Sequence, residues 1–295
     1  MAIEFDCVLP SGALLGESPV WSRDEGLLYW VDIDGRAVHA FDPATGADRM
    51  WPLPARPSAI AKTNDRSRLL VAVENALAWL DLDRGGLTEW VTLEKSQPGV
   101  RLNDGRCDPV GRFWIGGMYD PTSERRFEAF LHRVEPDGSF TTVRDEVGCA
   151  NGLAFSPDGT VMYWADTLHE TIWGYDYDVA TGLQSNERIF LDFGPLPGRP
   201  DGAAVDETGC YWIACVGGFA VLRVTPTGKV DRTVEIPVRR PSMPAFGGPG
   251  LDTLFVTTIG ERNPGLDGPG EHGGIYALDV GVGGLPEPHF GAHFD

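Results

Sequence analysis

Four segments of the chain share a tryptophan-containing strand, and the residue that begins the strand before it carries an oxygen in each case. Aligned on Trp30, Trp114, Trp164 and Trp212, these residues are Glu17, Asn103, Asn151 and Asp201, and each is followed five positions later by Ser or Asp. Carboxylate and amide oxygens suit a divalent cation such as calcium, magnesium or manganese, and zinc and iron(II) also accept them. Acids gathered without a cation would repel one another. The pattern therefore indicates a metal site, provided that the four strands converge.

The same residues also fit an alternative interpretation as turn formers. Asn151-Gly152, Asp104-Gly105 and Asp201-Gly202 are dipeptides that tolerate positive φ angles and often form tight turns. Glu17 is a poor turn former, however. Turns alone would also not require oxygen-bearing residues at the same position of four repeats. The shared position favours a binding site.

The elements that would position these residues are short repeated strands. Turn signals such as SPDG at Ser156 to Gly159 recur, and each precedes an apolar, aromatic-rich run of five to eight residues. Six such units of about 40 to 50 residues predict an all-β, six-bladed β-propeller with four-stranded blades, as one domain over residues 1–295. A large β-sandwich or barrel is the alternative. Because an open ring leaves an exposed edge, we expect residues 3–8 to form the outer strand of the last blade.

Composition limits the possible partners. The chain has 43 acidic and 24 basic side chains, a net charge of −19, which makes nucleic acids and anionic membranes poor partners. Its five cysteines include no CxxC pair, and its amino end has neither the basic region nor the cleavage site of a signal peptide. We expect a monomeric cytoplasmic protein whose partner is a small molecule, and whose cysteines and tryptophans mostly pack in strands.

Four motifs together resemble the gluconolactonase and regucalcin family, also called the senescence marker protein family, and the resemblance runs over essentially the whole chain. They are GESPVW at Gly16 to Trp21, RLNDGRCDPVGRFWIG at Arg101 to Gly116, NGLAFSPDG at Asn151 to Gly159 and RPDGAAVDETGCYWIA at Arg199 to Ala214. The resemblance implies a six-bladed propeller with metal-dependent lactonase activity.

The resemblance also implies roles for individual residues. Glu17, Asn151 and Asp201 would bind the divalent cation, which could be calcium, zinc, manganese or iron(II). Arg101 and Asn103 would contact a sugar lactone.

The remaining substrate contacts are less directly implied. Asp104 is a third member of the R-x-N-D-G motif and could share in binding the lactone. Where animal members have a glutamate that reaches substrate hydroxyls, Tyr119 and Asp120 stand here. We expect one of these two residues to replace the glutamate, so the sugar preference does not carry over.

A lactone is an ester, so its hydrolysis needs a polarised carbonyl, an activated water and stabilisation of the oxyanion. We expect Asp201 both to bind the metal and to accept the proton of the water, with an aldonolactone such as xylonolactone or gluconolactone as substrate. No G-x-S-x-G elbow is present, and His169 fits a surface loop better than a catalytic triad. The alternatives are a non-catalytic calcium-binding propeller and an arylesterase-type lactonase that acts on apolar lactones.

Overall fold

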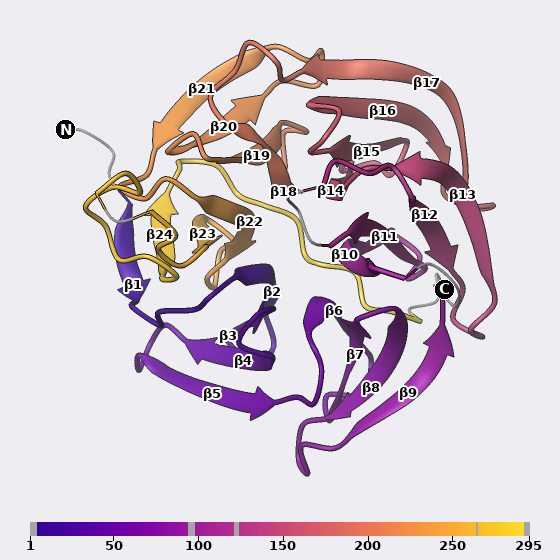
Figure 1. The fold of residues 1–295 in the computed structure, drawn as a ribbon, viewed down its shortest axis with the longest axis horizontal. Coiled ribbons are helices and arrows are strands. Elements are labelled where there is room, and N and C mark those ends of the chain that lie inside the picture. Colours follow the sequence, from indigo (N-terminus) through magenta and orange to yellow (C-terminus); the bar gives the residue numbers. More distant parts are fainter. Residues whose placement is uncertain (1–4, 94–97, 121–123, 264, 292–295) are drawn as a thin grey trace.

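The protein is a ring of six four-stranded antiparallel sheets, which confirms the predicted six-bladed β-propeller (Figure 1). The computed structural model describes residues 5–93, 98–120, 124–263 and 265–291. No helix occurs among these residues, and none of them therefore forms a helix that could span a membrane.

Each blade runs from an innermost strand beside the axis to an outermost strand at the rim (Figure 1). In this order, blade 1 contains β2 (Gly16–Ser22), β3 (Leu27–Asp32), β4 (Ala37–Asp42) and β5 (Ala47–Pro52); blade 2 contains β6 (Pro57–Lys62), β7 (Arg68–Val73), β8 (Ala76–Asp81) and β9 (Leu87–Thr92); blade 3 contains β10 (Val100–Cys107), β11 (Phe113–Tyr119), β12 (Ala129–Val134) and β13 (Phe140–Val147). Blade 4 contains β14 (Ala150–Phe155), β15 (Val161–Asp166), β16 (Thr171–Asp178) and β17 (Leu183–Asp192); blade 5 contains β18 (Arg199–Val205), β19 (Tyr211–Val216), β20 (Ala220–Val224) and β21 (Val230–Glu235); blade 6 contains β22 (Pro241–Gly247), β23 (Thr253–Thr258), β24 (Ile275–Asp279) and β1 (Asp6–Leu9).

The first strand of the chain closes the ring, as predicted. β1 pairs antiparallel with β24, so blade 6 combines residues from both ends of the sequence. The predicted closing strand covered residues 3–8, of which residues 3 and 4 lie outside the described part of the chain. Pairing of β1 removes the free edge that β24 would otherwise expose.

The hydrophobic core lies between the blades. In the described part of the chain, a cluster of buried apolar side chains fills each of the six interfaces between neighbouring sheets. The four aligned tryptophans are at most 1% exposed, which confirms that they pack between blades: Trp30, Trp114, Trp164 and Trp212. The four cysteines predicted to be strand residues are also buried, and none forms a disulfide: Cys107, Cys149, Cys210 and Cys215.

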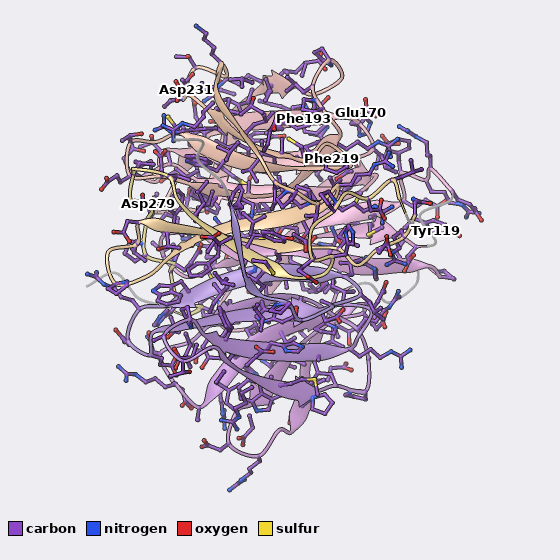
Figure 2. The ribbon with its side chains drawn as sticks, turned by 90° about the vertical axis from the view of Figure 1, so that its left-hand side faces the viewer. Tyr119, Glu170, Phe193, Phe219, Asp231 and Asp279 are labelled. Carbon is purple, nitrogen blue, oxygen red and sulfur yellow. The ribbon has the colours of Figure 1, made fainter. Side chains whose placement is uncertain are left out.

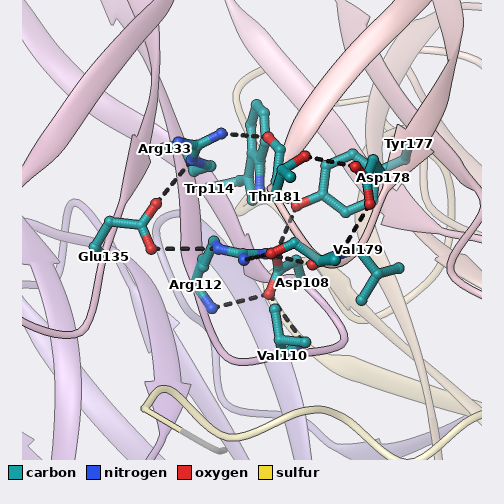
Figure 3. Close-up of polar contacts among 12 residues, drawn as sticks. Asp108, Val110, Arg112, Trp114, Arg133, Glu135, Tyr177, Asp178, Val179 and Thr181 are labelled. Carbon is teal, nitrogen blue, oxygen red and sulfur yellow. Dashed lines mark hydrogen bonds and ion pairs between the residues drawn. The ribbon is translucent and has the colours of Figure 1, made fainter. Parts of the chain in front are cut away.

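The second recurring oxygen position, five residues after the candidate ligands, stabilises turns. The Asp108 carboxylate accepts hydrogen bonds from Arg112 Nη1 at 2.9 Å and from the Tyr177 hydroxyl at 2.5 Å (Figure 3). In the equivalent turn of blade 5, Asp206 accepts hydrogen bonds from Trp212 Nε1 at 2.9 Å and Arg223 Nε at 2.8 Å. These carboxylates are fully buried and paired: Asp108 joins blades 3 and 4, and Asp206 holds the turn and strands of blade 5, so neither faces a ligand.

The residues that follow β24 cross the ring on the face opposite the starts of the innermost strands. In Figure 1 this yellow segment runs from blade 6 over the centre toward blade 3. Along the way Glu287 pairs with Arg106 at 3.2 Å, and the Phe290 amide donates to the Lys62 carbonyl at 2.7 Å. A cavity of about 350 Å³ lies beneath the segment, lined by Arg106, Phe155, Phe246 and Leu285 among others.

Candidate functional site

A β-bulge interrupts every innermost strand near its start. In β2 the regular pairing stops at Glu17 opposite Val31 and resumes at Val20 opposite Tyr29, so three steps along β2 match two along β3. The same irregularity occurs in β6, β10, β14, β18 and β22. A bulge bends its strand and redirects the side chains next to it. All six innermost strands are therefore distorted at the level where the candidate ligands lie.

The bulges show that the four predicted residues do not hold identical positions. Glu17 and Asn151 occupy the last pair before the bulge, whereas Leu102 and Pro200 hold that place in β10 and β18. Asn103 and Asp201 thus lie one residue further along, inside the bulge. In a regular strand this shift would turn a side chain to the opposite face of the sheet. The bulge removes that restriction, and the side chains still interact across the blades.

Glu17 and Asp201 form the acidic part of the site. Burial, followed by the charges of Asp201 and Asp104, raises the pKa of the Glu17 carboxyl well above its usual value. Burial and the charge of Asp104 raise the pKa of Asp201 in the same direction. Arg101 opposes both shifts without cancelling them. Asp201 of blade 5 therefore lies close enough to Glu17 of blade 1 to influence the ionisation of Glu17.

Asn151 lies between neighbouring blades and is buried. Its Oδ1 accepts a hydrogen bond from Asn103 Nδ2 at 3.2 Å, and its Nδ2 donates to Thr167 Oγ1 at 2.7 Å. The Thr167 hydroxyl in turn donates to the Pro200 carbonyl at 2.8 Å, next to Asp201. Thr167 was not among the predicted residues, although it directly follows the tryptophan-containing strand of blade 4. It links the strand that carries Asn151 to the strand that carries Asp201.

Arg101 and Asn103 form the other side of the site. Arg101 Nη1 donates to Asn103 Oδ1 at 2.9 Å, and the Asn103 amide donates to the Ala150 carbonyl at 2.9 Å. The Arg101 side chain is 8% exposed, and its Nε is buried without a hydrogen-bond partner. The buried guanidinium of Arg101 therefore lies beside the two carboxylates, and its Nε–H group donates no hydrogen bond.

Asp104 has a structural contact of its own. Its Oδ2 accepts a hydrogen bond from the Leu153 amide at 3.0 Å, which joins β10 to β14. Burial raises the pKa of Asp104, whereas this hydrogen bond and Arg106 lower it. The carboxylate thus adds negative charge next to Asp201 while one of its oxygens is used within the fold.

Tyr119 and Asp120 lie at the end of β11. The guanidinium of Arg126 stacks over the Tyr119 ring at 4.4 Å. Asp120 Oδ2 lies 2.5 Å from Arg56 Nη1 and 3.6 Å from Arg101 Nε. Figure 2, which views the ring from its edge, shows Tyr119 and Glu170 on one face and Asp231 and Asp279 on the other. We call the first the site face, because the innermost strands begin there.

Two buried carboxylates that the sequence did not single out hold the strands of Glu17 and Asn151. Asp166 accepts hydrogen bonds from the Gly148 amide at 2.8 Å and the Cys149 amide at 3.1 Å. Asp32 accepts from the Leu14 and Leu15 amides, both at 3.0 Å, at the equivalent place in blade 1. Each carboxylate fixes the backbone just before a candidate ligand. The shared WxD ending of the two strands, at Trp30 and Trp164, is the signal that could have identified them.

His169 lies on the loop after Asp166, as predicted for a surface histidine. Its side chain is 44% exposed, and Nδ1 lies 2.8 Å from Asp166 Oδ2. Among the hydrogen bonds of the described residues, none joins His169 to a serine nucleophile. His169 therefore belongs to the support of the Asn151 strand.

The donor set fits a divalent metal ion. Glu17 supplies a half-buried carboxylate, Asp201 supplies a buried one, and Asn151 supplies an amide oxygen. Burial, and after it neighbouring negative charge, raises the pKa of both carboxyls, and a cation would offset both effects. Within the described residues no three acidic, histidine or cysteine side chains form a metal-binding group. The candidate ligands are instead two acids and one amide, an oxygen-only combination that hard cations accept.

Comparison with known proteins agrees with the predicted family. The family model described as "SMP-30/Gluconolactonase/LRE-like region" matches residues 15–260. A 6-deoxy-6-sulfogluconolactonase from Pseudomonas putida is 36% identical over 291 residues, with 96% of this chain and 97% of the relative covered. Pentonolactonase XacC from Haloferax volcanii is 35% identical over 293 residues, covering 95% and 96% of the two chains.

A solved structure shows the same architecture. The crystal structure of a calcium-binding protein, regucalcin, from Agrobacterium tumefaciens superimposes with a TM-score of 0.90 at 31% identity, covering 98% of each chain. Its fold therefore corresponds to that of this chain throughout the ring.

Proposed function

Because the chain belongs to the SMP-30/gluconolactonase/LRE-like family, we propose that it hydrolyses an aldonolactone to the aldonic acid with a divalent cation. Glu17, Asn151 and Asp201 would hold the cation, which could be calcium, zinc, manganese or iron(II). Arg101 and Asn103 would bind the sugar, and Asp104, Tyr119 and Asp120 would border it. The proposal covers pentonolactones such as xylonolactone and hexonolactones such as gluconolactone.

One observation carries the proposal: burial raises the pKa of both the half-buried Glu17 of blade 1 and the buried Asp201 of blade 5, the charge of Asp201 raises that of Glu17 further, and the buried Arg101 lies beside them. Such an arrangement is unfavourable for folding unless a ligand compensates it. The names of two relatives, a sulfogluconolactonase and a pentonolactonase, support sugar lactones as the substrate class.

The residues of the chain have separable tasks in lactone hydrolysis. A bound divalent cation would polarise the lactone carbonyl and lower the pKa of a coordinated water. Asp201 accepts the proton of the attacking water, because it is the carboxylate within the bulge whose ionised form is least stabilised by hydrogen bonds. The positive charge of the buried Arg101 lies next to the site and would attract substrate oxygens, while its Nε lies 3.6 Å from Asp120 Oδ2. The Asn103 amide, fixed by Arg101 and Ala150, orients the sugar.

The decisive experiment is a hydrolysis panel with metal-free protein. Chelated enzyme is reloaded separately with calcium, zinc, manganese or iron(II) and assayed with gluconolactone, xylonolactone, an aryl ester and an acyl lactone. The proposal predicts aldonolactone hydrolysis that depends on added metal. Metal binding without any turnover would instead support a non-catalytic calcium-binding propeller, and preference for the aryl ester or acyl lactone would support an arylesterase-type enzyme.

A further inference from the structure

In four of the six blades, an arginine stands immediately before the residue of the innermost strand that is the last to pair ahead of the bulge. They are Arg56 before Pro57, Arg101 before Leu102, Arg199 before Pro200 and Arg240 before Pro241. Blades 1 and 4, which supply Glu17 and Asn151, have Gly16 and Ala150 at this place. Four arginines thus hold equivalent chain positions at the beginning of the innermost strands, on the site face.

Each of these arginines is paired with a carboxylate from a loop on the same face. The nitrogen-to-oxygen distances are 3.1 Å for Arg56–Glu74, 3.6 Å for Arg101–Asp120, 3.3 Å for Arg199–Glu170 and 3.2 Å for Arg240–Asp267. Positive charge is therefore present around the site but is compensated locally.

The pairs nearest to the candidate substrate residues form one continuous chain, Glu74–Arg56–Asp120–Arg101. Glu74 accepts hydrogen bonds from Arg56 Nε and Nη2, both at 3.1 Å, and Arg56 Nη1 reaches Asp120 Oδ2 at 2.5 Å. The hydrogen bonds with Glu74 raise the pKa of Arg56. Burial acts to raise the pKa of Glu74, but the contacts with Arg56 outweigh it and lower that pKa. Two cations and two anions leave this chain with no net charge.

The chain of pairs is attached to the strand that bears Arg101 and Asn103. The Leu102 amide donates to the Glu74 carbonyl at 2.6 Å, and the Asp120 amide donates to the Gly99 carbonyl at 2.7 Å. The side chains of Arg56, Glu74 and Asp120 remain 27%, 39% and 25% exposed, so solvent reaches all three, and we call this group the mouth of the proposed site. A substrate held by Arg101 would extend past them.

We propose that Glu74 and Asp120 neutralise Arg56 and thereby set the charge selectivity of the site in favour of lactones without an anionic substituent. This inference rests on the proposed function for its substrate and adds Arg56 and Glu74 as specificity-determining residues. An uncompensated guanidinium in this position would attract a phosphate, sulfonate or carboxylate group on the far end of the sugar. With both partners in place, the mouth offers such a group no net attraction.

The test changes one charge and keeps the geometry. Glu74→Gln retains the side-chain oxygen that accepts from Arg56 but leaves the mouth with one additional positive charge. The measured quantity is the ratio of kcat/KM for glucono-1,5-lactone 6-phosphate to that for glucono-1,5-lactone. We expect Glu74→Gln to raise this ratio about fivefold at low salt, and the gain to shrink at high salt. The double variant Arg56→Gln/Glu74→Gln should return the ratio to the wild-type value.

The matched control is Glu187→Gln, which removes a carboxylate from the outer strand of blade 4, where Glu187 pairs with Arg144 on the outer strand of blade 3. It changes the net charge equally but lies at the rim, so the ratio should not move. An unchanged ratio in Glu74→Gln, or an equal rise in Glu187→Gln, overturns the inference.

A binding measurement separates this inference from the proposed function. The calorimetric Kd values of glucitol and glucitol 6-phosphate give the same comparison without turnover. Absence of lactone hydrolysis in the metal-loaded wild type would refute the proposed function, while a tighter relative Kd for the phosphate in Glu74→Gln would still support the charge assignment. Unchanged relative Kd values would refute that assignment independently.

Discussion

At the scale of single residues, the candidate site combines unfavourable electrostatics with few local contacts. Glu17 receives one long hydrogen bond from the Ser18 amide at 3.4 Å, and Asp201 is stabilised by the Gly202 backbone, so neither carboxylate has a strong neutralising partner. By contrast, the buried Asp206 is paired with Arg223. This difference separates carboxylates that hold the fold from carboxylates available to a ligand.

Removing one candidate ligand should abolish both metal binding and activity. We expect Asp201→Asn to weaken metal affinity by more than about 100-fold and to lower kcat by about 10²- to 10⁴-fold, because it removes a charged ligand and the proton acceptor together. Arg101→Gln should keep the metal and lose turnover. Equilibrium dialysis and lactone hydrolysis measure the two effects, and full activity in Asp201→Asn would contradict the mechanism.

The metal-free protein should become less stable as the pH rises. Burial raises the pKa of Glu17 and Asp201 in the folded state above the ordinary values of 4.5 and 3.8, so the folded state binds more protons than the unfolded state. Stability from these groups is fully present below about pH 4 and is lost as the pH passes through the raised pKa values.

Thermal unfolding of chelated protein between pH 4 and pH 8 measures this effect. Asp201→Asn should have a higher Tm than the wild type at pH 8, and the difference should narrow toward pH 4. Added metal should remove the difference. If the chelated wild type instead gained stability relative to Asp201→Asn as the pH rises, the ionised Asp201 carboxylate would not destabilise the metal-free fold, and the prediction would be wrong.

At the scale of elements, the strands could be predicted from the sequence but their bulges could not. Turn residues and alternating apolar runs indicate where β14 and β18 lie, and the recurring tryptophan indicates how they align. The one-residue displacement of Asp201 relative to Glu17 arises from pairing between strands, which no local pattern encodes. The four arginines that precede the bulges were also missed, although an Arg-Pro dipeptide marks three of them, at Arg56, Arg199 and Arg240.

Buried carboxylates at the ends of β3 and β15 position the strands that bear the candidate ligands. Asp166→Ala would leave the Gly148, Cys149 and Leu168 amides without their acceptor, and we expect a loss of about 3 kcal/mol in the free energy of unfolding. Because Asn151 follows two residues after Cys149, metal affinity should also fall, by about 10- to 100-fold.

The variant Asp32→Ala tests whether the equivalent carboxylate of blade 1 has the same effect on stability and metal affinity as Asp166. Asp32 binds the Leu14 and Leu15 amides before Glu17, so its replacement should cause a similar loss of both stability and metal affinity. Denaturant unfolding and metal titration check the two variants. Loss of stability with unchanged metal affinity in both would mean that these carboxylates serve the fold alone.

At the scale of the whole molecule, both ends of the chain join parts of the ring that are distant in sequence. The repeats predicted the six blades because they follow a pattern that can be aligned, and the need to cover the edge of the last blade predicted the closing strand. The path of the segment after β24 has no counterpart in the repeats, so nothing in its sequence predicts that it crosses from blade 6 to blades 2 and 3 (Figure 1). Tertiary contacts alone determine this path.

Phe290 should anchor this crossing segment. Its side chain is 5% exposed, and its ring lies 5.9 Å from that of Trp79 and 5.6 Å from that of Trp90. We expect Phe290→Ala to lower the free energy of unfolding by about 3–5 kcal/mol, since it leaves a cavity beside two aromatic rings. Denaturant unfolding followed by tryptophan fluorescence measures this loss.

The matched control is Phe140→Ala, because Phe140 is 41% exposed at the start of β13 and its replacement should cost much less. Since Phe290 lies on the face opposite Glu17 and Asp201, lactone hydrolysis by the folded variant should remain near the wild-type rate. Faster proteolysis between residues 281 and 291 in Phe290→Ala would show that the segment has detached from blade 2. A loss of stability no larger than that of Phe140→Ala would mean that the crossing segment adds little to the ring, and that closure depends on the pairing of β1 with β24.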